Sequence, residues 1–261
     1  MICRLAVALA VTAAARPARA DGPSDRTREV EAAVTTAMGA AYLVAEVGFS
    51  RQLSPTTCTW CDPDGFDAGA RNLLRWRDTS LANTLSDATG YVSAPLAAAG
   101  LTILAGRGHD WRRHYDDVVP IVQAAIAASL VQHVTKVTVA RQRPYAHYAA
   151  PGTLVPSEED NVSFWSGHTS LTFALAVSAG TVTSSRGYAL APVVWATGLG
   201  LAAATGYLRI AADRHYATDA LTGAVMGTLV GYAWPKLVHP WIGRDVDVVP
   251  TANGLAAVGR F

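Results

Sequence analysis

Hydrophobic residues lie in long runs that are separated by short polar links, and the runs show no strand-like alternation. They occupy residues 29–48, 88–106, 118–139, 168–184, 187–208 and 216–234. Apolar stretches of this length are typical of helices rather than of strands. We therefore expect an all-α fold, a bundle of about six core helices.

Two segments outside these runs predict smaller elements. The polar stretch 50–87 contains the turn-rich piece CTWCDPDG and then, over 66–87, a pattern that predicts a surface helix. The tail 245–261 places Asn-Gly between two mildly alternating stretches, which indicates a small C-terminal β-hairpin. Because no repeat or low-complexity linker divides the chain, we expect a single domain over residues 21–261.

Composition favours a membrane bundle over an ordinary soluble domain. Charged residues make up 16% of the chain, against roughly 25% in a typical soluble domain. Hydrophobic residues reach 51% and the mean hydropathy is +0.21. The runs are rich in Ala and Gly rather than Leu, however, and one contains Gln123, Gln132 and His133, so a soluble bundle stays open. A net charge of +1 without a basic, aromatic stripe argues against nucleic acid as a partner.

The first 20 residues have the pattern of a secretory signal peptide. Arg4 precedes the apolar run 5–15, which is too short to span a bilayer, and Ala18-Arg19-Ala20 offers a cleavage site before Asp21. We expect cleavage after Ala20, the alternative being an uncleaved tail.

The cysteine pattern fits an exported protein. Cys3 would be removed with the signal peptide, which leaves Cys58 and Cys61 in the motif CTWC. In an oxidising compartment this pair predicts a local disulfide. We find no further ligands with suitable spacing for a zinc site.

The first polar group on an apolar run is Lys136 with Arg143 and Pro144. The two cations are seven residues apart, nearly two helical turns, so they would share one helix face. Proline would end the helix there and leave Arg143 facing a loop. Arg141 falls elsewhere on the helical wheel, where we expect a contact with solvent or lipid headgroups.

The second group is Ser166-Gly167-His168, at the junction of a loop and an apolar run. Serine is a favoured helix cap, and the free backbone N–H groups at a helix start bind anions. Gly167 would let a ligand approach the backbone closely, with His168 beside it.

The third group combines Arg209, His215 and Asp219. His215 and Asp219 are four residues apart, so on a helix Asp219 would accept a hydrogen bond from one imidazole nitrogen. The other nitrogen would then face outward as a nucleophile or base. For Asp213 and Arg214 we expect local surface contacts. Each group alone has an ordinary structural explanation, but the ordered set of three is hard to obtain by chance.

This order of motifs resembles the type 2 phosphatidic acid phosphatase family, whose superfamily includes class A nonspecific acid phosphatases and vanadium haloperoxidases. The family pattern is KxxxxxxRP, PSGH and SRxxxxxHxxxD. The first block matches fully, whereas Trp165 replaces proline in the second and Leu208 replaces serine in the third. The motifs and their helices span residues 115–235, and the resemblance of 21–114 is general.

The resemblance implies a phosphatase that needs no metal or cofactor. Lys136, Arg143 and Arg209 would hold phosphate oxygens, with Ser166 and the Gly167 N–H as neutral donors. His215 would attack phosphorus, Asp219 would orient His215, and His168 would protonate the leaving group. The acidic run 158–160 is expected to be solvated surface, the alternatives being that it repels some substrates or restrains a cation.

Topology adds a location. Glu29, Glu31 and Glu46 argue against a membrane-spanning 29–48, since acids in lipid are costly. With five spans, the basic patch 107–114 would be cytoplasmic, and the motifs and CTWC would face the periplasm. A soluble periplasmic protein satisfies the same constraints.

The substrate class follows the location. We expect a phosphorylated lipid for a membrane protein and small phosphate esters for a soluble acid phosphatase. The alternatives to a phosphatase are a vanadium-dependent haloperoxidase and a noncatalytic membrane protein.

Overall fold

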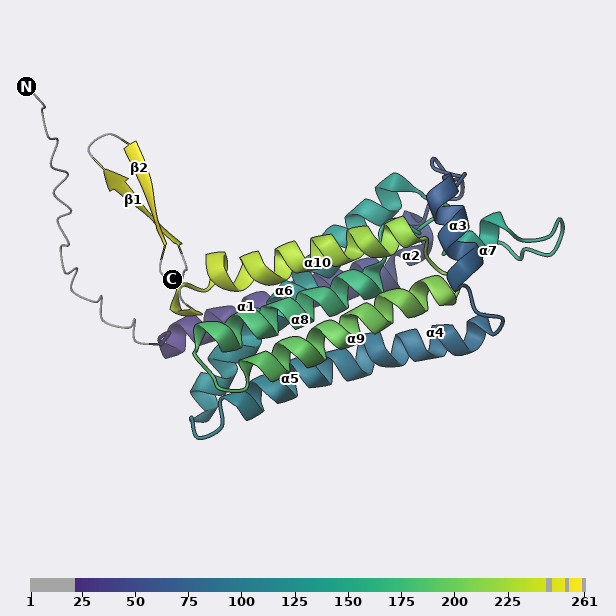
Figure 1. The fold of residues 1–261 in the computed structure, drawn as a ribbon. Coiled ribbons are helices and arrows are strands. Elements are labelled where there is room, and N and C mark those ends of the chain that lie inside the picture. Colours follow the sequence, from purple (N-terminus) through teal and green to yellow (C-terminus); the bar gives the residue numbers. More distant parts are fainter. Residues whose placement is uncertain (1–21, 243–245, 252–253, 260–261) are drawn as a thin grey trace, which may run out of the picture.

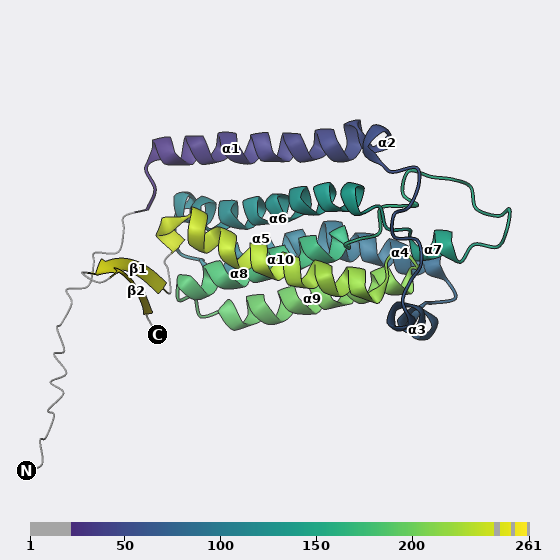
Figure 2. The same cartoon turned by 90° about the horizontal axis from the view of Figure 1, so that it is seen from above.

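The computed structural model describes residues 22–242, 246–251 and 254–259, and it confirms the predicted helical bundle (Figures 1 and 2). The long helices are α1 (Asp25–Leu43), α5 (Ala94–Ala105), α6 (Trp111–Val139), α8 (Gly167–Ser185), α9 (Ala191–Ala211) and α10 (Ala217–Val238). Shorter helices are α2 (Ser50–Leu53), α3 (Gly65–Leu74), α4 (Thr79–Asp87) and α7 (Pro144–His147), with a 3₁₀ turn at Pro240–Ile242. The predicted signal peptide lies outside the described residues.

The single surface helix expected over 66–87 is wrong, because the segment forms two helices. Asp64 caps α3 by accepting the Asp67 N–H at 2.8 Å, and Asp78 caps α4 by accepting the Leu81 N–H at 2.9 Å. The second of these helices continues through a π-helical turn, Ala88–Ser93, into α5. One long helical stretch, Thr79–Ala105, thus replaces the expected run 88–106.

Helix α6 ends before the proline that was expected to end it. Ala140 adopts a left-handed conformation with φ 49°, and its N–H bonds to the carbonyl of Lys136. Pro144 instead begins α7. Arg143 therefore lies outside α6, and the expectation that it shares a helix face with Lys136 does not hold.

Small residues let α8 sit at the centre of the bundle, between α6, α9 and α10 (Figures 1 and 2). At Gly227 of α10, an added Cβ would collide with the backbone oxygen of Ser170 in α8. Close backbone contact through small residues is a common way to pack helices whose outer faces are apolar.

Helix α1 lies along α6 (Figure 2), and several of its charged side chains bond to α6. Along its length, acidic or basic groups pair with α6 through Arg28–Asp116 at 2.8 Å, Glu31–Gln123 at 2.7 Å and Glu46–Lys136 at 2.7 Å. Its apolar residues face outward, with Val30 56% and Val47 73% exposed. Glu31 and Glu46 contact protein rather than lipid, so these two no longer argue against a membrane-spanning α1, whereas Glu29, in the second turn of the helix, is exposed.

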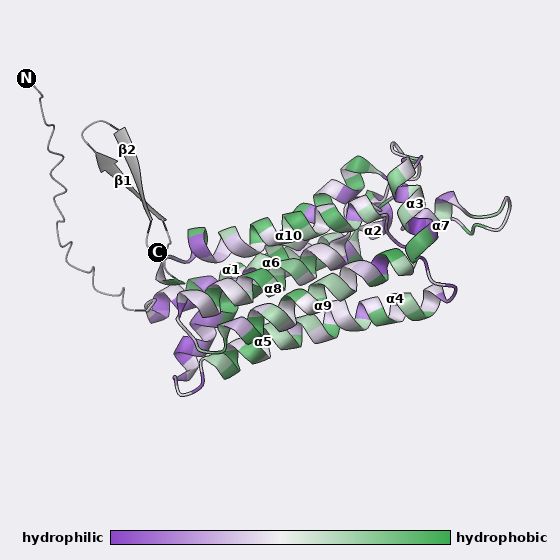
Figure 3. Ribbon diagram, in the orientation of Figure 1, coloured by the Kyte–Doolittle hydropathy of each residue, from purple (hydrophilic) through white to green (hydrophobic). Residues whose placement is uncertain are grey.

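The outer surface of the bundle is apolar, while hydrophilic residues gather towards its two ends (Figure 3). Within the described residues, the helices long and apolar enough to cross a membrane are Asp25–Gly48, Thr79–Ala105, Trp111–Val139 and Ala191–Ala211. Exposed apolar patches of this extent are rare on soluble monomers. The structure therefore supports an association with the membrane.

The predicted C-terminal hairpin is present. Strands β1 (Val246–Thr251) and β2 (Gly254–Gly259) pair antiparallel, with Thr251 opposite Gly254. Gly254 of the Asn-Gly pair that predicted the hairpin begins β2, and Asn253 lies outside the described residues. The hairpin stands at the end of the bundle where α10 finishes (Figure 1).

Candidate active site

Three distant motif segments meet at one end of the bundle. Nη1 of Arg143 lies 3.5 Å from Nε2 of His215. The Ser166 N–H donates to the backbone oxygen of Asp219 at 3.1 Å. Arg209 sits in the last turn of α9, six residues before His215. The tertiary structure thus brings together residues that are 72 positions apart in the chain.

His215 lies in the loop between α9 and α10, not on a helix, and its side chain is 3% exposed. Its Nδ1 lies 2.8 Å from the carbonyl oxygen of Ser163. A carbonyl can only accept, so Nδ1 carries the proton and the Nε2 lone pair faces Arg143. Burial, followed by the charges of Arg143 and Arg209, lowers the pKa of His215 well below 6.5. The ring is therefore neutral at pH 7, with a lone pair on Nε2.

Asp219 orients His215 indirectly, which differs from the expected direct hydrogen bond. Its Oδ2 is 3.7 Å from Nδ1 of His215. Oδ2 instead accepts from the Ser163 hydroxyl at 2.6 Å and from the Tyr216 N–H at 2.9 Å. Asp219 thus holds Ser163, whose carbonyl holds the imidazole. Sequence reasoning missed Ser163, because the α10 helix begins only after His215.

Arg141 is buried, and the expectation of a solvent or headgroup contact is wrong. Its side chain is 1% exposed, with Nη2 2.6 Å from Asp67 and Nη1 2.5 Å from Asp219. The rings of Trp60 and Tyr216 lie on its guanidinium at 3.8 Å and 4.3 Å from their centroids. The helical wheel failed here because Ala140 had already turned the chain inward.

Arg143 is fixed by backbone carbonyls, which leaves part of its guanidinium for a ligand. Nε donates to the oxygen of Glu159 at 2.8 Å, and Nη1 donates to the oxygen of Arg214 at 3.2 Å. No contact of Nη2 is found within the described residues. Because backbone partners carry no net charge, they position Arg143 without neutralising it.

The acidic run 158–160 has mixed roles. Asp160 is 7% exposed and accepts from the Tyr145 hydroxyl at 2.8 Å, so it is not solvated surface. Glu159 pairs with Arg214 at 2.6 Å and so restrains a cation. Burial alone would raise the pKa of Glu159, but the charges of Arg143 and Arg214 outweigh it and lower that pKa.

Asp213 also lies inside the protein rather than on its surface. It is 4% exposed, and its carboxylate accepts from Arg71 at 2.6 Å and from Arg75 at 3.0 Å. It ties α3 to the loop that carries His215. Its φ of 60° is the second left-handed non-glycine conformation near the site, after Ala140.

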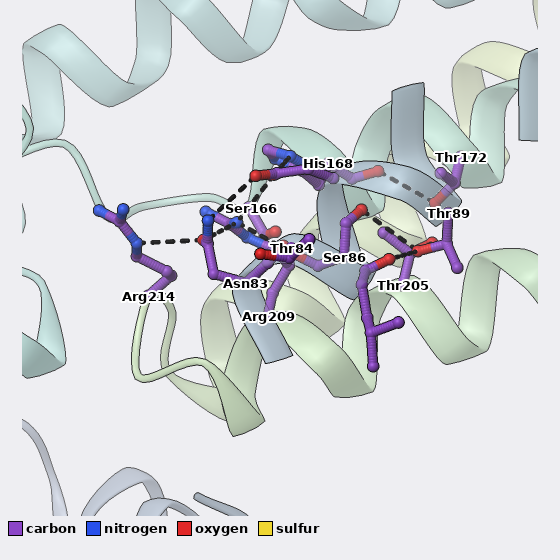
Figure 4. A network of polar contacts seen from close by, with 12 residues as sticks. Asn83, Thr84, Ser86, Thr89, Ser166, His168, Thr172, Thr205, Arg209 and Arg214 are labelled. Carbon is purple, nitrogen blue, oxygen red and sulfur yellow. Dashed lines mark hydrogen bonds and ion pairs between the residues drawn. The ribbon is translucent and has the colours of Figure 1, made fainter. Parts of the chain in front are cut away.

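Arg209 reaches across to α4 (Figure 4). Its Nη1 donates to the Asn83 side-chain oxygen at 2.9 Å and to the Ser86 hydroxyl at 3.1 Å. The Asn83 oxygen also accepts from Arg214 at 3.2 Å. The Nε of Arg209 is buried and has no partner in the described part of the chain. A buried cation with an unused donor suits an anionic ligand.

His168 is the first-turn residue of α8, and α4 supplies its partner. Its Nε2 lies 2.8 Å from the carboxylate of Asp87. Its ring packs against Tyr91, with centroids 4.4 Å apart. A Cβ at Gly90 would come within 3.0 Å of that ring, so the π-helical turn needs glycine here. Asp87 can share the proton of His168 and hold its orientation.

The start of α8 offers fewer free donors than expected. Ser166 caps the helix, since its hydroxyl accepts the Thr169 N–H at 3.4 Å. Its own N–H is occupied by Asp219. The amides of Gly167 and His168 find no acceptor among the described residues, as is usual for the first turn of a helix. The predicted anion site at this terminus thus rests on two amides.

Lys136 forms an ion pair with a carboxylate of the π-helical turn that follows α1. Its Nζ is 2.7 Å from both carboxylate oxygens of Glu46. Glu46 lies in a π-helical turn, Val44–Gly48, and also contacts Nδ1 of His133 at 2.6 Å. Sequence analysis paired Lys136 with Arg143 and did not find Glu46.

A polar cavity of about 1250 Å³ borders the site on its outer side. Its wall includes Asn83, which bonds to Arg209, and Glu159 and Arg214, whose carbonyls bond to Arg143. A second, apolar groove of about 770 Å³ lies between α3, α9 and α10 and is lined by Thr169, Ile210 and Ala217. These three residues adjoin His168, Arg209 and Tyr216 in sequence.

Further features frame the site. Cys58 and Cys61 form a disulfide, and Trp60 between them contacts Arg141. In the part of the chain that is described, His, Cys, Asp and Glu side chains form no group of three that could hold a metal ion.

Comparison with known proteins gives one result. The family model described as PAP2 superfamily matches residues 117–242, a range that contains every motif residue above. No curated protein matches the chain.

Proposed function

The chain belongs to the PAP2 superfamily, and we propose that it hydrolyses a lipid-linked phosphate monoester or diphosphate through a phosphohistidine on His215. A phosphatase-type function follows from the family. The geometry of His215 carries the finer proposal. Its Nδ1–H donates a hydrogen bond to the carbonyl oxygen of Ser163. The Nε2 lone pair therefore faces Arg143 and can attack phosphorus.

In the first step, Nε2 of His215 forms a bond to phosphorus while the bond from phosphorus to the leaving oxygen breaks. His168 gives its proton to that oxygen. In the second step, water attacks phosphorus, His168 takes a proton from the water, and the N–P bond breaks to release phosphate. Lys136, Arg143 and Arg209 offset the charge on the phosphoryl oxygens, with Ser166 and the Gly167 N–H as neutral groups.

Phosphoenzyme trapping tests this step. Substrate labelled on the transferred phosphoryl group, quenched within milliseconds, should give a base-stable and acid-labile label on His215. A label on serine, or phosphate release with no labelled protein at any time, would contradict the nucleophile assignment. The variant His168→Ala should accumulate more label for substrates with good leaving groups, because water attack then lacks its base.

Two features support a lipid as the carrier of the phosphate. The bundle has an apolar outer surface with four helices able to cross a membrane. The apolar groove is lined by Thr169 and Ile210, the sequence neighbours of His168 and Arg209. We expect phosphate esters with long acyl chains to have a higher kcat/KM than short-chain esters of the same headgroup. Equal values would favour a soluble, nonspecific acid phosphatase.

The orientation follows from charge. The basic patch 107–114 and Arg186 lie at the bundle end opposite the motifs (Figure 1). The positive-inside rule favours a cytoplasmic location for that end, and therefore a periplasmic site. The disulfide at the site end fits an oxidising compartment.

This orientation conflicts with cleavage of the signal peptide if α1 crosses the membrane. Asp25 pairs with Arg112 of the basic patch at 2.9 Å, so α1 starts at the same end. A cleaved chain would start outside, and its site would then face the cytoplasm. A soluble bundle is compatible with both expectations. The mass of the mature N-terminus, together with a carbonate wash of the membranes, distinguishes these cases.

A further inference from the structure

Glu46, which lies outside the three motif segments, forms a close ion pair with Lys136. The carboxylate spans Nζ with both oxygens at 2.7 Å, and the side chains are 33% and 14% exposed. His133, one turn earlier on α6, holds the same carboxylate at 2.6 Å. Lys136 therefore faces a built-in anion rather than open space.

A carboxylate and a phosphoryl oxygen compete for the same donors. An ammonium group has three N–H donors and no acceptor, and two of them point at Glu46 here. A phosphoryl group that uses Lys136 fully must take over these donors. The negative charge of Glu46 also opposes the approach of a second anion.

The position of Glu46 allows its side chain to move away from Lys136. It lies in the π-helical turn Val44–Gly48 that ends α1, and such turns frequently occur at functional sites. Its side chain is one-third exposed, unlike the fully buried carboxylates Asp67 and Asp219. His133 can continue to hold Glu46 once Lys136 has left it.

We propose that Glu46 is a specificity-determining residue that occupies Lys136 in the absence of substrate and so weakens the binding of phosphate. The proposal rests on the proposed function, because it takes Lys136 as a phosphate ligand. By competing for Lys136, the carboxylate weakens the binding of the phosphate product. A phosphoryl group displaces Glu46 from Lys136 only when Arg143 and Arg209 bind that phosphoryl group too.

The test is Glu46→Gln, which keeps an oxygen acceptor for Lys136 and removes the charge. We expect inorganic phosphate to bind the variant about tenfold more tightly than the wild type and to inhibit it at correspondingly lower concentration. The reason is that the variant lacks the charge that competes for Lys136, and a tenfold gain corresponds to about 1.4 kcal/mol. The value of kcat should not rise. Glu31→Gln is the matched control, because Glu31 lies on the same helix face and bonds to Gln123 at 2.7 Å.

Unchanged or weaker phosphate binding in Glu46→Gln would overturn the proposal, since a residue that merely positions Lys136 gives weaker binding. A similar tightening in Glu31→Gln would overturn it too, because the effect would then be general to α1. Calorimetry with inorganic phosphate measures binding without turnover.

A double-mutant cycle tests whether Glu46 acts through Lys136. In a Lys136→Met background, Glu46→Gln should raise phosphate affinity much less than tenfold, because only the direct charge repulsion is then relieved. A full tenfold gain there would refute the competition. Wild-type protein that binds phosphate but hydrolyses no ester would overturn the proposed function and leave this test in force. Wild-type protein that binds no phosphate would overturn both.

Discussion

The N-terminal half, residues 22–105, and the motif half, residues 111–238, contribute different kinds of residue to the candidate site. The motif half supplies the cations and the two histidines. The N-terminal half supplies their partners: Glu46 for Lys136, Asp87 for His168, Asn83 for Arg209 and Asp67 for Arg141. The groups proposed to touch phosphate thus come from one half, whereas both halves hold them. Arg143 and His215 bond to carbonyls of the motif half. Lys136, His168 and Arg209 bond to side chains of the N-terminal half.

This difference explains why only one half carries a recognisable motif. Residues that surround one phosphate from neighbouring helix ends need fixed spacing along the chain. A partner on a separate helix needs only to lie at the same level as the site along the bundle axis. The N-terminal half therefore contributes to the site without a spacing signature.

The largest expected effect is in the motif half. His215→Ala should lower the rate of phosphate release on the order of 10⁴–10⁶-fold, because it removes the proposed nucleophile. Helix content by circular dichroism should be unchanged. Turnover within tenfold of the wild type would remove His215 from the mechanism.

The next effect concerns the contact between the halves. Arg141→Met leaves Asp67 and Asp219 buried without their shared cation, and should cost about 3–5 kcal/mol of unfolding free energy. Arg75→Met is the control, because Asp213 keeps Arg71 at 2.6 Å. A loss below about 1 kcal/mol for both variants in denaturant unfolding would show that the buried contact stabilises little.

A smaller effect is expected from the N-terminal half. Asp87→Asn should lower kcat about tenfold to a hundredfold for alkyl phosphates, because His168 loses the carboxylate that shares its proton. Aryl phosphates, whose leaving groups need less protonation, should be less affected. Asp78→Asn on the same helix is the control. Equal losses for both substrate classes would indicate a purely structural role.

The smallest expected effect concerns pH: protonation of His215 should not change kcat/KM near pH 6.5. His215 attacks only when neutral, and its pKa is lowered well below 6.5 by burial and by Arg143 and Arg209. The value of kcat/KM for an aryl phosphate should therefore not fall from protonation of the nucleophile as pH drops through 6.5. A fall of activity near pH 6.5 in the wild type would contradict this if it moved to higher pH in Arg143→Met, because loss of that cation raises the pKa of His215.

Sequence reasoning succeeded where spacing and periodicity were the signal. The long apolar runs became helices, and the Asn-Gly turn became a hairpin. It failed where a helix ended without a proline signal. Ala140 turned the chain, so Arg141 became buried and Arg143 left the helix face of Lys136. An alanine in a left-handed conformation has no sequence signature, since tertiary contacts impose it.

The sequence by itself determined the class of fold, the family and the residues proposed to contact phosphate, because helix periodicity and motif spacing are local properties of the chain. Only the tertiary structure decided which carboxylate faces each of these groups. Ser163 between Asp219 and His215, Asp87 beside His168 and Glu46 on Lys136 arise from packing between separate segments. Such contacts depend on how helices align in space, which no spacing along the chain specifies.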